Sequence, residues 1–363
     1  MSTVHLEDVR VTRDGTEILH GIDLHVHDRE RLAVLGPSGS GKSTLLRAVA
    51  GLDDVSAGQV VLDDRDVTGL ATREREVSMV SQAGGLMRHL DVEGNLGFPL
   101  SIRRVGQDEK RRRVDAEARA FSLSGILRRK PRTLSAGEQQ EVSLARSLVR
   151  RGGVLLLDEP FSKADAPRRA DLVRELIRIQ EGYGVTLLIA TNDQRVAMSV
   201  AQRCAVLHRG RIAQLGPPTQ LYATPATTFV ATFLGSPPMN LVPGRIERVA
   251  GRARLQAGPL TVPALGPRLS RLIDSACTVG IRPGDLERAS PAALVTIEEV
   301  VTRTAFLGSE VEVALSLGAG SDAELVAVLD RPAPRVGELL RLMVAPEDIH
   351  VFAPDGQALS HGV

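Results

Sequence analysis

The sequence predicts an α/β domain in the N-terminal part of the chain and an all-β domain in the C-terminal part. Residues 31–35 form an apolar run that leads through a glycine-rich loop into an apolar helix, and residues 155–157 form a second buried strand that ends in two acids. After about position 235, short β-rich runs alternate with Gly, Pro and Asp. Strands separated by helices indicate a parallel sheet, whereas closely spaced short strands favour a small antiparallel barrel.

The glycine-rich loop fits the phosphate-binding pattern G-x-x-x-x-G-K-[ST], in which glycines let backbone N–H groups turn towards phosphates. The following helix, expected over residues 44–50, directs its N-terminus at the bound anion. We expect Lys42 to reach the β and γ phosphates, Ser43 to bind Mg²⁺, and Thr44 to cap or pack the same turn. The alternative is an ordinary glycine-rich turn. The expected ATP-binding residues are Gly36, Pro37, Ser38, Gly39, Ser40, Gly41, Lys42, Ser43 and Thr44.

The second apolar run delivers Asp158 and Glu159 at its C-terminal end, where open α/β sheets place ligands. We expect Asp158 to hold Mg²⁺ through water. Glu159, one residue further and in a drier position, is the candidate base that orients the attacking water. Taken alone, the string also fits a strand that ends in solvated acids.

Between these strings lies Thr-Leu-Ser-Ala-Gly-Glu-Gln-Gln at positions 133–140. Ser135 and Glu138 fit an S-x-x-E capping box, so an ordinary helix start is one interpretation. The stretch also resembles the LSGGQ signature of the ABC transporter ATPase family, and its position between the two nucleotide motifs supports that resemblance. The resemblance implies that Ser135, Ala136, Gly137 and Glu138 face ATP held by a second subunit, so that the chain dimerises around two nucleotides.

Further motifs of this family follow in order over about 235 residues. The resemblance assigns Gln82 to Mg²⁺ and the lytic water, and residues 86–100 to the surface that contacts a permease. Asp165 lies where the dimer-crossing D-loop belongs, and Asn192 occupies the position of the family's switch histidine. The resemblance therefore implies Glu159, Asn192 and Gln82 as catalytic residues, and Ser43, Gln82 and Asp158 as metal-binding residues.

Four departures from the family pattern predict a slow but active ATPase. Residues 1–97 contain no Phe, Tyr or Trp to stack on adenine, and Arg13 or Asp14 occupies the expected place. Weaker nucleotide affinity follows unless Arg13 lies across the ring. Ala136 adds a methyl group and Glu138 a negative charge near the phosphates. Asn192 still donates a hydrogen bond but cannot carry positive charge.

Composition places limits on the function. The 363 residues suit two domains or one large one, and a net charge of +1 gives no electrostatic reason to expect nucleic acid. Basic runs at 111–113 and 128–130 are interpreted as solvated helical faces. Cys204 and Cys277 are too far apart in sequence to suggest a disulfide framework. Neither a secretory signal nor a membrane span is expected from the sequence.

The C-terminal part resembles the linker and OB-type (TOBE/MOP-like) regulatory repeats of the maltose-importer ATPase subunit and its sugar and glycerol-phosphate relatives. Four weak motifs carry this resemblance, at residues 235–240, 280–283, 306–310 and 346–352. We therefore expect an ATPase domain at 1–235, with a helical subdomain at about 84–150, and an OB-type domain at 236–363. Six strands are expected, at 253–256, 278–281, 294–301, 310–317, 324–329 and 339–344.

The resemblance implies an ATPase subunit that energises import of a sugar or related polar solute, with ATP and Mg²⁺ as cofactors. Its expected partners are a second ATPase subunit, two membrane permeases and an extracytoplasmic solute-binding protein, at the cytoplasmic face of the membrane. Nucleic acid is not an expected partner. Three alternatives stay open: a degenerate regulatory subunit with an active sister chain, an importer of a polyamine, metal or sulfate, and a soluble ATPase of DNA repair or translation.

Overall fold

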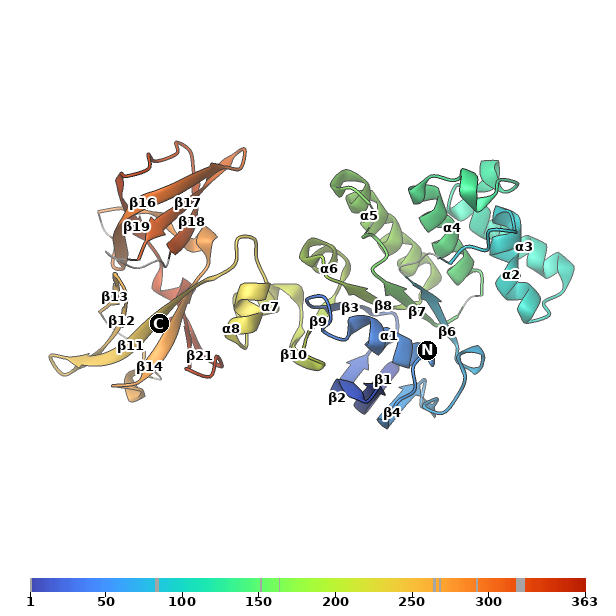
Figure 1. Ribbon diagram of the computed structural model, residues 1–363, viewed down its shortest axis with the longest axis horizontal. Helices are drawn as coiled ribbons and strands as arrows, with labels where there is room; N and C mark the ends of the chain where they lie inside the picture. The colour runs from blue at the N-terminus through green and yellow to red at the C-terminus, as the bar shows by residue number, and fades with distance from the viewer. Residues whose placement is uncertain are drawn as a thin grey trace. The chain divides into compact units, whose positions relative to one another are not determined.

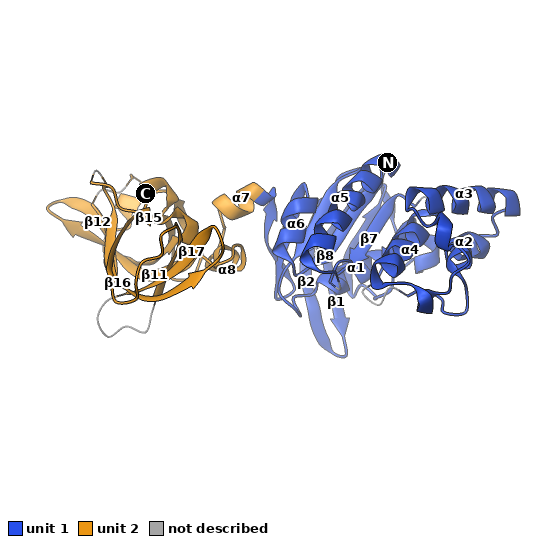
Figure 2. Ribbon diagram, turned by 90° about the horizontal axis from the view of Figure 1, so that it is seen from above, with its two compact units in different colours: residues 1–218 blue, residues 219–363 orange. Residues whose placement is uncertain are grey.

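The computed structural model describes residues 2–81, 85–150, 152–162, 164–263, 266–267, 269–291, 293–317 and 324–363. Two compact units make up the chain, residues 1–218 and 219–363 (Figure 2). This division lies earlier than the expected boundary after residue 235. Two short helices, α7 (Pro218–Ala223) and α8 (Thr228–Phe233), precede that boundary. The backbone around α8 is hydrogen-bonded to the last strands of the second unit, since Thr228 N donates to Gly356 O at 2.8 Å.

A six-stranded sheet is the centre of the first unit (Figure 1). Its order is β10-β9-β3-β8-β7-β6, and all pairs are parallel except the edge pair of β10 with β9. The bounds are β3 (Arg31–Leu35), β6 (Val77–Val80), β7 (Val154–Asp158), β8 (Thr186–Thr191), β9 (Arg203–His208) and β10 (Arg211–Gly216). Every residue of β7 and β8 is buried, as expected for strands covered on both faces.

A second, antiparallel sheet packs on the same unit in the order β2-β1-β4-β5. Its strands are β1 (Val4–Arg13), β2 (Thr16–Val26), β4 (Ala57–Leu62) and β5 (Arg65–Asp66). Helix α1 (Lys42–Ala50) shares one hydrophobic core with both sheets, through Leu45, Leu46 and Val49. Helices α5 (Ala166–Tyr183) and α6 (Gln194–Val200) lie beside the parallel sheet, where α6 contacts β3 and β8. The helix that follows the phosphate loop is therefore enclosed by apolar packing.

In the described residues, three α-helices separate β6 from β7: α2 (Val92–Ile102), α3 (Gln107–Ala120) and α4 (Ala136–Leu148). Asp91 caps α2 by accepting from Gly94 N at 2.8 Å. The basic run at 111–113 lies on α3, as expected. The helical interpretation is wrong for residues 128–130, which connect two 3-10 turns between α3 and α4. Each of their side chains is engaged: Arg128 pairs with Glu93, Arg129 with Glu138, and Lys130 donates to His89 O.

A buried arginine joins the C-terminus of α1 to the segment before β6. Arg75 is 2% exposed, and its guanidinium donates to the carbonyls of Ala48 and Val49 at 2.7 and 2.9 Å. It also donates to Leu70 O and Thr68 O at 3.0 and 2.9 Å. The cation thus satisfies carbonyls that a helix end leaves unpaired, where the helix dipole favours positive charge.

The second unit contains two antiparallel sheets, ordered β13-β12-β11-β14-β20-β21 and β15-β19-β16-β17-β18. The first comprises β11 (Asn240–Val249), β12 (Arg252–Ala257), β13 (Leu260–Val262), β14 (Ala276–Ile281), β20 (His350–Phe352) and β21 (Ala358–His361). The second comprises β15 (Glu287–Arg288), β16 (Thr296–Phe306), β17 (Glu310–Ser316), β18 (Glu324–Asp330) and β19 (Leu339–Met343). Both sheets contribute to one aliphatic core. All six expected strands are present, and the all-β prediction is confirmed.

Three polar side chains are buried in the described part of this unit, and each has internal partners. Asn240 bonds the backbone of Ile281 and Val326. Arg282 donates to Leu234 O at 2.7 Å and to Tyr222 O, and its guanidinium lies 3.5 Å from the centre of the Tyr222 ring. His350 Nδ1 lies 2.9 Å from Nδ1 of His361. Cys204 and Cys277 are both free and buried.

Across the described residues, no helix combines the length and the apolar character needed to cross a membrane.

Candidate nucleotide-binding and hydrolysis site

Parallel strands bring the separate sequence motifs to one edge of the sheet. The phosphate loop follows β3, Asp158 ends β7, and Thr191 ends β8, which lies between them. Strand β6, on the other side of β7, ends at Val80. Carboxyl ends of parallel strands meet at the same edge, so motifs more than a hundred residues apart in sequence share one site.

The backbone of the loop requires glycine at two positions. A Cβ atom at Gly36 would lie 2.3 Å from the Leu207 carbonyl oxygen and 2.7 Å from Ser40 Oγ. Gly41 has φ +106° and caps the N-terminus of α1. Ser40 Oγ is buried and has no hydrogen-bond partner in the described part of the chain. A tightly wound loop with an unsatisfied hydroxyl suits a ligand with many acceptor oxygens, such as a triphosphate.

Lys42 is 7% exposed and directs its ammonium group onto its own loop. Its Nζ donates to the carbonyls of Gly36 and Pro37 at 2.8 and 3.0 Å. Burial lowers the pKa of Lys42, although the nearby Glu159 and Asp158 carboxylates oppose that change. A partly desolvated cation of this kind interacts strongly with any anion that enters the loop.

The predicted metal-binding hydroxyl and carboxylate lie together. Ser43 Oγ donates to Asp158 Oδ1 at 2.8 Å across 115 positions of sequence. Asp158 is 8% exposed, so the carboxylate is held in a dry position at the end of β7. Hydroxyl and carboxylate oxygens are the donors that Mg²⁺ prefers, and this pair therefore fits that ion when it enters with a nucleotide.

Glu159 has a backbone conformation that is uncommon for residues other than glycine. Its φ is +48°, and its N–H donates to Ala190 O at 2.9 Å. The carboxylate lies 3.5 Å from the Thr191 hydroxyl. Burial raises the pKa of Glu159, while Lys42 and the backbone near Asn192 act in the opposite sense. The expectation that Glu159 is drier than Asp158 is wrong, because Glu159 is only half-buried whereas Asp158 is buried.

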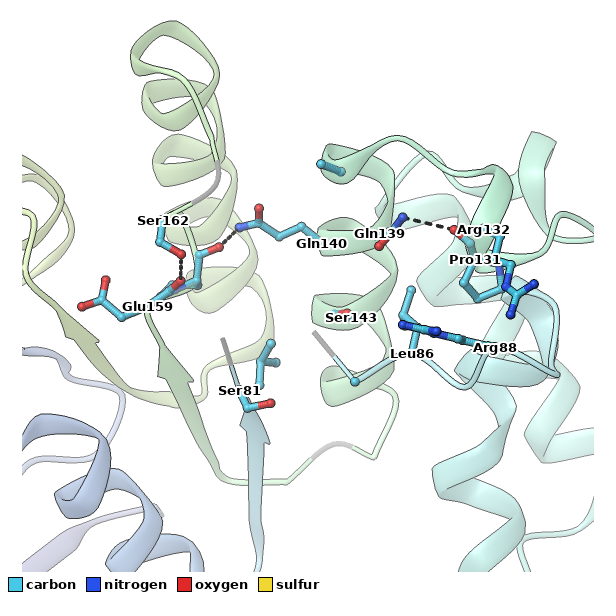
Figure 3. A pocket seen from close by; sticks show the side chains of 14 residues that line it. Ser81, Leu86, Arg88, Pro131, Arg132, Gln139, Gln140, Ser143, Glu159 and Ser162 are labelled. Atoms are coloured by element: carbon cyan, nitrogen blue, oxygen red, sulfur yellow. Dashed lines mark hydrogen bonds between the residues drawn. The ribbon is translucent and has the colours of Figure 1, made fainter. Parts of the chain in front are cut away.

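Glu159 opens into a cavity of about 600 Å³ between the parallel sheet and helix α4 (Figure 3). Gln140 crosses part of this space and donates its side-chain amide to Pro160 O. Ser162 Oγ donates to Glu159 O at 3.0 Å. The backbone of Glu159 is thus held by its own turn, and that of the adjacent Pro160 by α4, while the carboxylate points away from α4 in Figure 3.

The signature stretch forms the start of α4. Ser135 Oγ accepts from Glu138 N at 3.2 Å, and Glu138 Oε2 accepts from Ser135 N at 2.6 Å, so the predicted capping box is confirmed. Ala136 and Gly137 are the first two helical residues, and Ala136 lines the cavity of Figure 3. Glu138 Oε1 also accepts from Arg129 at 3.0 Å. The charge of Glu138, which is expected to lie near a polyanion, therefore has a cationic partner within the chain.

The remaining predicted site residues lie at three places. Asn192 follows β8 and is exposed, next to Thr191. Asp165 caps α5 by accepting from Arg168 N at 2.9 Å, so its side chain has a structural role in this conformation. Gln82 lies outside the described residues. The structure brings Lys42, Ser43, Asp158 and Glu159 together, while Ser135 and Asp165 lie at helix starts away from Lys42.

An arginine pair shares a carboxylate near the place expected for adenine. Arg13, at the end of β1, donates to Asp53 at 2.5 Å, and Arg47, on α1, forms a two-pronged contact with the same carboxylate at 2.9 and 3.0 Å. Asp53 is 10% exposed. Neither Asp53 nor Arg47 was expected to take part. A sequence offers little signal for them, because their contact with Arg13 depends on the β1–β2 hairpin folding over α1.

Comparison with protein families and relatives agrees with this geometry. Residues 19–162 match the ABC transporter family model, residues 235–286 match the MalK OB fold domain, and residues 279–352 match the TOBE domain. An sn-glycerol-3-phosphate import ATP-binding protein of Agrobacterium fabrum is 37% identical over 363 residues, which is 99% of this chain and 100% of that relative. The chain belongs to the ABC importer ATPase family. A Chromohalobacter salexigens relative of the same description is 39% identical, over 98% of this chain and 95% of that protein.

Solved ABC structures share the fold of the ATPase unit. A dimeric ATP-binding cassette in a post-hydrolysis state, bound to ADP and Pi, is 27% identical with a TM-score of 0.54, covering 59% of this chain and 98% of that one. Part of a Clostridium perfringens ABC transporter complex is 25% identical with a TM-score of 0.56, over 61% and 90% of the two chains. The predicted ABC ATPase fold and the carbohydrate-importer branch are therefore confirmed.

Proposed function

We propose that this ABC ATPase hydrolyses Mg-ATP with Glu159 as the base that orients the attacking water. The observation that carries the proposal is the assembly of Lys42, the Ser43–Asp158 pair and Glu159 at one sheet edge. Lys42 binds the terminal phosphates, and Ser43 and Asp158 hold the metal, which supplies charge neutralisation at the phosphates. The raised pKa of Glu159 suits a residue that accepts a proton, because a stronger base is a better acceptor.

Catalysis by this site needs a second ATPase subunit. Ser135 and the free N–H groups at the start of α4 are a ready anion-binding end of a helix, but no described hydrogen bond joins them to Lys42 or Ser43. We infer that they face ATP held by a partner, in a homodimer or with a close relative. Asp165 and Asn192 then contribute to the shared sites, as does Gln82 by the family resemblance.

A second cavity supports docking of a membrane permease. It measures about 410 Å³ and lies between the sheet and α2, with a mainly apolar lining that includes Met79, Met87, Phe98, Pro99 and Ile102. Arg73, Arg103 and Arg150 lie at the same cavity. An apolar helix with acidic flanks, exposed by a permease towards the cytoplasm, matches this surface. Through two such permeases the chain is held at the membrane and served by an extracytoplasmic binding protein.

The relatives point to a solute class. Their printed descriptions concern import of sn-glycerol-3-phosphate. We propose that the complete importer takes up a phosphorylated polyol or a related sugar. Because the permease and the binding protein choose the solute, uptake is measured in cells that carry the whole system. Labelled glycerol-3-phosphate is the test solute and labelled maltose the comparison, each with and without the gene for this chain. If deletion of the gene abolishes neither uptake, the solute assignment is contradicted, but the proposed ATPase activity is not.

The enzymatic part is tested on the purified chain. Glu159→Gln keeps the size of the side chain but cannot accept a proton, so turnover should fall at least about 100-fold. Asn192→His restores a group that can carry positive charge and should not lower turnover. Steady hydrolysis by the wild type without a sister chain contradicts the regulatory-subunit alternative, which the Ala136 and Asn192 substitutions otherwise favour. Equal rates in wild type and Glu159→Gln would remove Glu159 from this role.

A further inference from the structure

We propose that Arg129 is a positioning residue for the signature turn, residues 133–138. Its guanidinium neutralises Glu138 and so allows this acid to lie beside the phosphates of ATP. The proposal rests on the proposed function, in which this turn faces a nucleotide held by the partner subunit. Two contacts carry it: Arg129 Nη1 donates to Glu138 Oε1 at 3.0 Å, and its Nη2 donates to Thr133 O. One guanidinium therefore holds both the acid and the backbone that precedes Ser135.

Two hydrogen bonds to Ser135 hold Glu138 against the turn. Its other oxygen, Oε2, accepts from Ser135 N at 2.6 Å, and its own N–H donates to Ser135 Oγ at 3.2 Å. The acid is thus bound to the serine that is expected to meet the γ-phosphate. A carboxylate in this position repels a triphosphate unless a cation lies on its other side. Arg129 is that cation in the described structure.

Arg129 also belongs to a segment that supports a second helix. The carbonyls of Leu127 and Arg129 accept from Glu93 N and Val92 N, both at 3.0 Å, at the start of α2. The same few residues therefore hold the N-terminus of α2 by their backbone and the N-terminus of α4 by a side chain. Helix α2 contributes Phe98 and Pro99 to the second cavity, where a permease is proposed to dock. A shift of α2 consequently moves the group that positions the signature.

Stability alone gives Arg129 little importance. The ion pair is partly exposed, with 41% of the arginine and 29% of the glutamate side chain accessible, and exposed pairs contribute little to folding. Gln139 independently holds the same turn, by donating to Pro131 O and Leu134 O at 3.1 Å each. The fold of the turn thus has other supports, whereas the charge of Glu138 is balanced by its ion pair with Arg129.

A double-mutant cycle tests the proposal on the full chain. Arg129→Ala should lower kcat/KM for ATP at least 10-fold, because Glu138 is left uncompensated. In a Glu138→Gln background, Arg129→Ala should change kcat/KM by less than about 3-fold relative to Glu138→Gln alone. Arg129→Lys should recover at least a third of wild-type activity. The matched control is Arg128→Ala, which removes a neighbouring arginine that pairs with Glu93 instead.

A second readout separates positioning from folding and from the proposed function itself. In a Glu159→Gln background, ATP-driven dimerisation measured by light scattering should weaken at least 10-fold on Arg129→Ala, with fluorescent ADP affinity unchanged. An equal loss with and without the Glu138→Gln substitution, or wild-type behaviour of Arg129→Ala in both assays, overturns the proposal. Failure of wild type to hydrolyse ATP contradicts the proposed function instead, and the dimerisation assay then decides on Arg129.

Discussion

The buried polar groups at the nucleotide site of the first unit and those of the β-unit play opposite roles. At the sheet edge of the ATPase unit, the buried Lys42 donates to the carbonyls of its own loop, the buried Asp158 accepts from Ser43, and the buried Ser40 hydroxyl has no partner among the described residues. In the β-unit, Arg282 and His350 are buried with partners on other elements of the same unit. The first set is arranged for a ligand, and the second set holds the fold together.

This difference predicts that substitutions in the two sets affect different quantities: nucleotide affinity for the first set and the free energy of unfolding for the second. Removing a group that is prepared for a ligand should reduce affinity with little loss of folding free energy, since its desolvation was unfavourable in the first place. Removing a group that satisfies buried carbonyls should reduce folding free energy and leave affinity unchanged. Each substitution below tests one side of the comparison, from the largest expected effect to the smallest.

Lys42→Ala should show the largest effect on binding. Loss of the charged contact to the terminal phosphates should raise the dissociation constant for Mg-ATP about 100-fold, equivalent to about 3 kcal/mol. The free energy of unfolding should change by less than about 1 kcal/mol, because two loop hydrogen bonds are lost together with the cost of burying the cation. Isothermal calorimetry and thermal melting measure the two quantities. Arg111→Ala, at an exposed position of helix α3, is the control, and a loss of stability larger than the loss of affinity would break the comparison.

Arg282→Ala should show the reverse pattern. The carbonyls of Leu234 and Tyr222 lose their donor and the Tyr222 ring loses its cation, so the β-unit should lose about 3 kcal/mol of unfolding free energy. The affinity for ATP should be unchanged. Hydrogen exchange of the full chain reports opening of residues 219–363 directly. Arg335→Ala removes an exposed arginine and serves as the control. Unchanged exchange in Arg282→Ala would show that the contact does not stabilise the unit.

The His350–His361 pair predicts a pH dependence confined to the β-unit. Burial lowers the pKa of His350 to about 4 from its ordinary value of 6.5, with His361 and Arg282 acting in the same direction. Between pH 6.5 and 4 the unfolded chain therefore binds the proton first, so the free energy of unfolding falls as the pH falls through this range. We expect a loss of up to about 2 kcal/mol, after allowance for solvent screening.

The measurement is hydrogen exchange of β20 and β21 at about pH 7, 5.5 and 4.5, values that span the titration range, corrected for intrinsic exchange rates. His350→Gln cannot take up the proton and should flatten the dependence, while His5→Gln on the ATPase unit should leave it intact. An identical pH dependence in wild type and His350→Gln would assign it to other groups.

Arg13→Trp should show the smallest effect. It replaces a residue near the place expected for adenine, whose side chain also forms an ion pair within the unit. An aromatic ring at this place should tighten ADP binding about 5- to 10-fold, because stacking on a base contributes ~1 to 3 kcal/mol. The substitution also removes one of the two arginines that bind Asp53, and Arg47 remains as its partner. Fluorescent-ADP titration measures the change, with Arg29→Trp as a surface control. A loss of affinity would indicate that Arg13 itself contacts the nucleotide as a cation.

The contiguous motifs were predictable because their chemistry is local. The loop from Gly36 to Ser43 and the Asp158–Glu159 pair each require a fixed order of neighbouring residues, and parallel strands then bring them together. The capping box of Ser135 and Glu138 is equally local and was also predicted. The regular spacing of short apolar runs was sufficient to predict six of the eleven strands that the structure describes in the C-terminal unit.

Features that depend on distant contacts were not predictable. The pairing of Arg129 with Glu138 requires the connection before α4 to fold back on it, and a run of basic residues gives no sign of that return. The half-burial of Glu159 follows from a left-handed backbone that carries it away from the strand. The division of the units at residue 218 depends on bonds between α8 and the last strands, far away in sequence.

Arg75 has a mechanical consequence for the ATPase unit. Its four hydrogen bonds join the last turn of α1 to residues 68–70, and Thr72 adds a fifth through the Gly51 carbonyl at 2.7 Å. Thr72 and Arg73 also form a wall of the cavity that contains Phe98. Residues 72–73 cannot move independently of α1 without breaking the hydrogen bonds of Arg75. The wall and the far end of the phosphate-loop helix must therefore travel as one body.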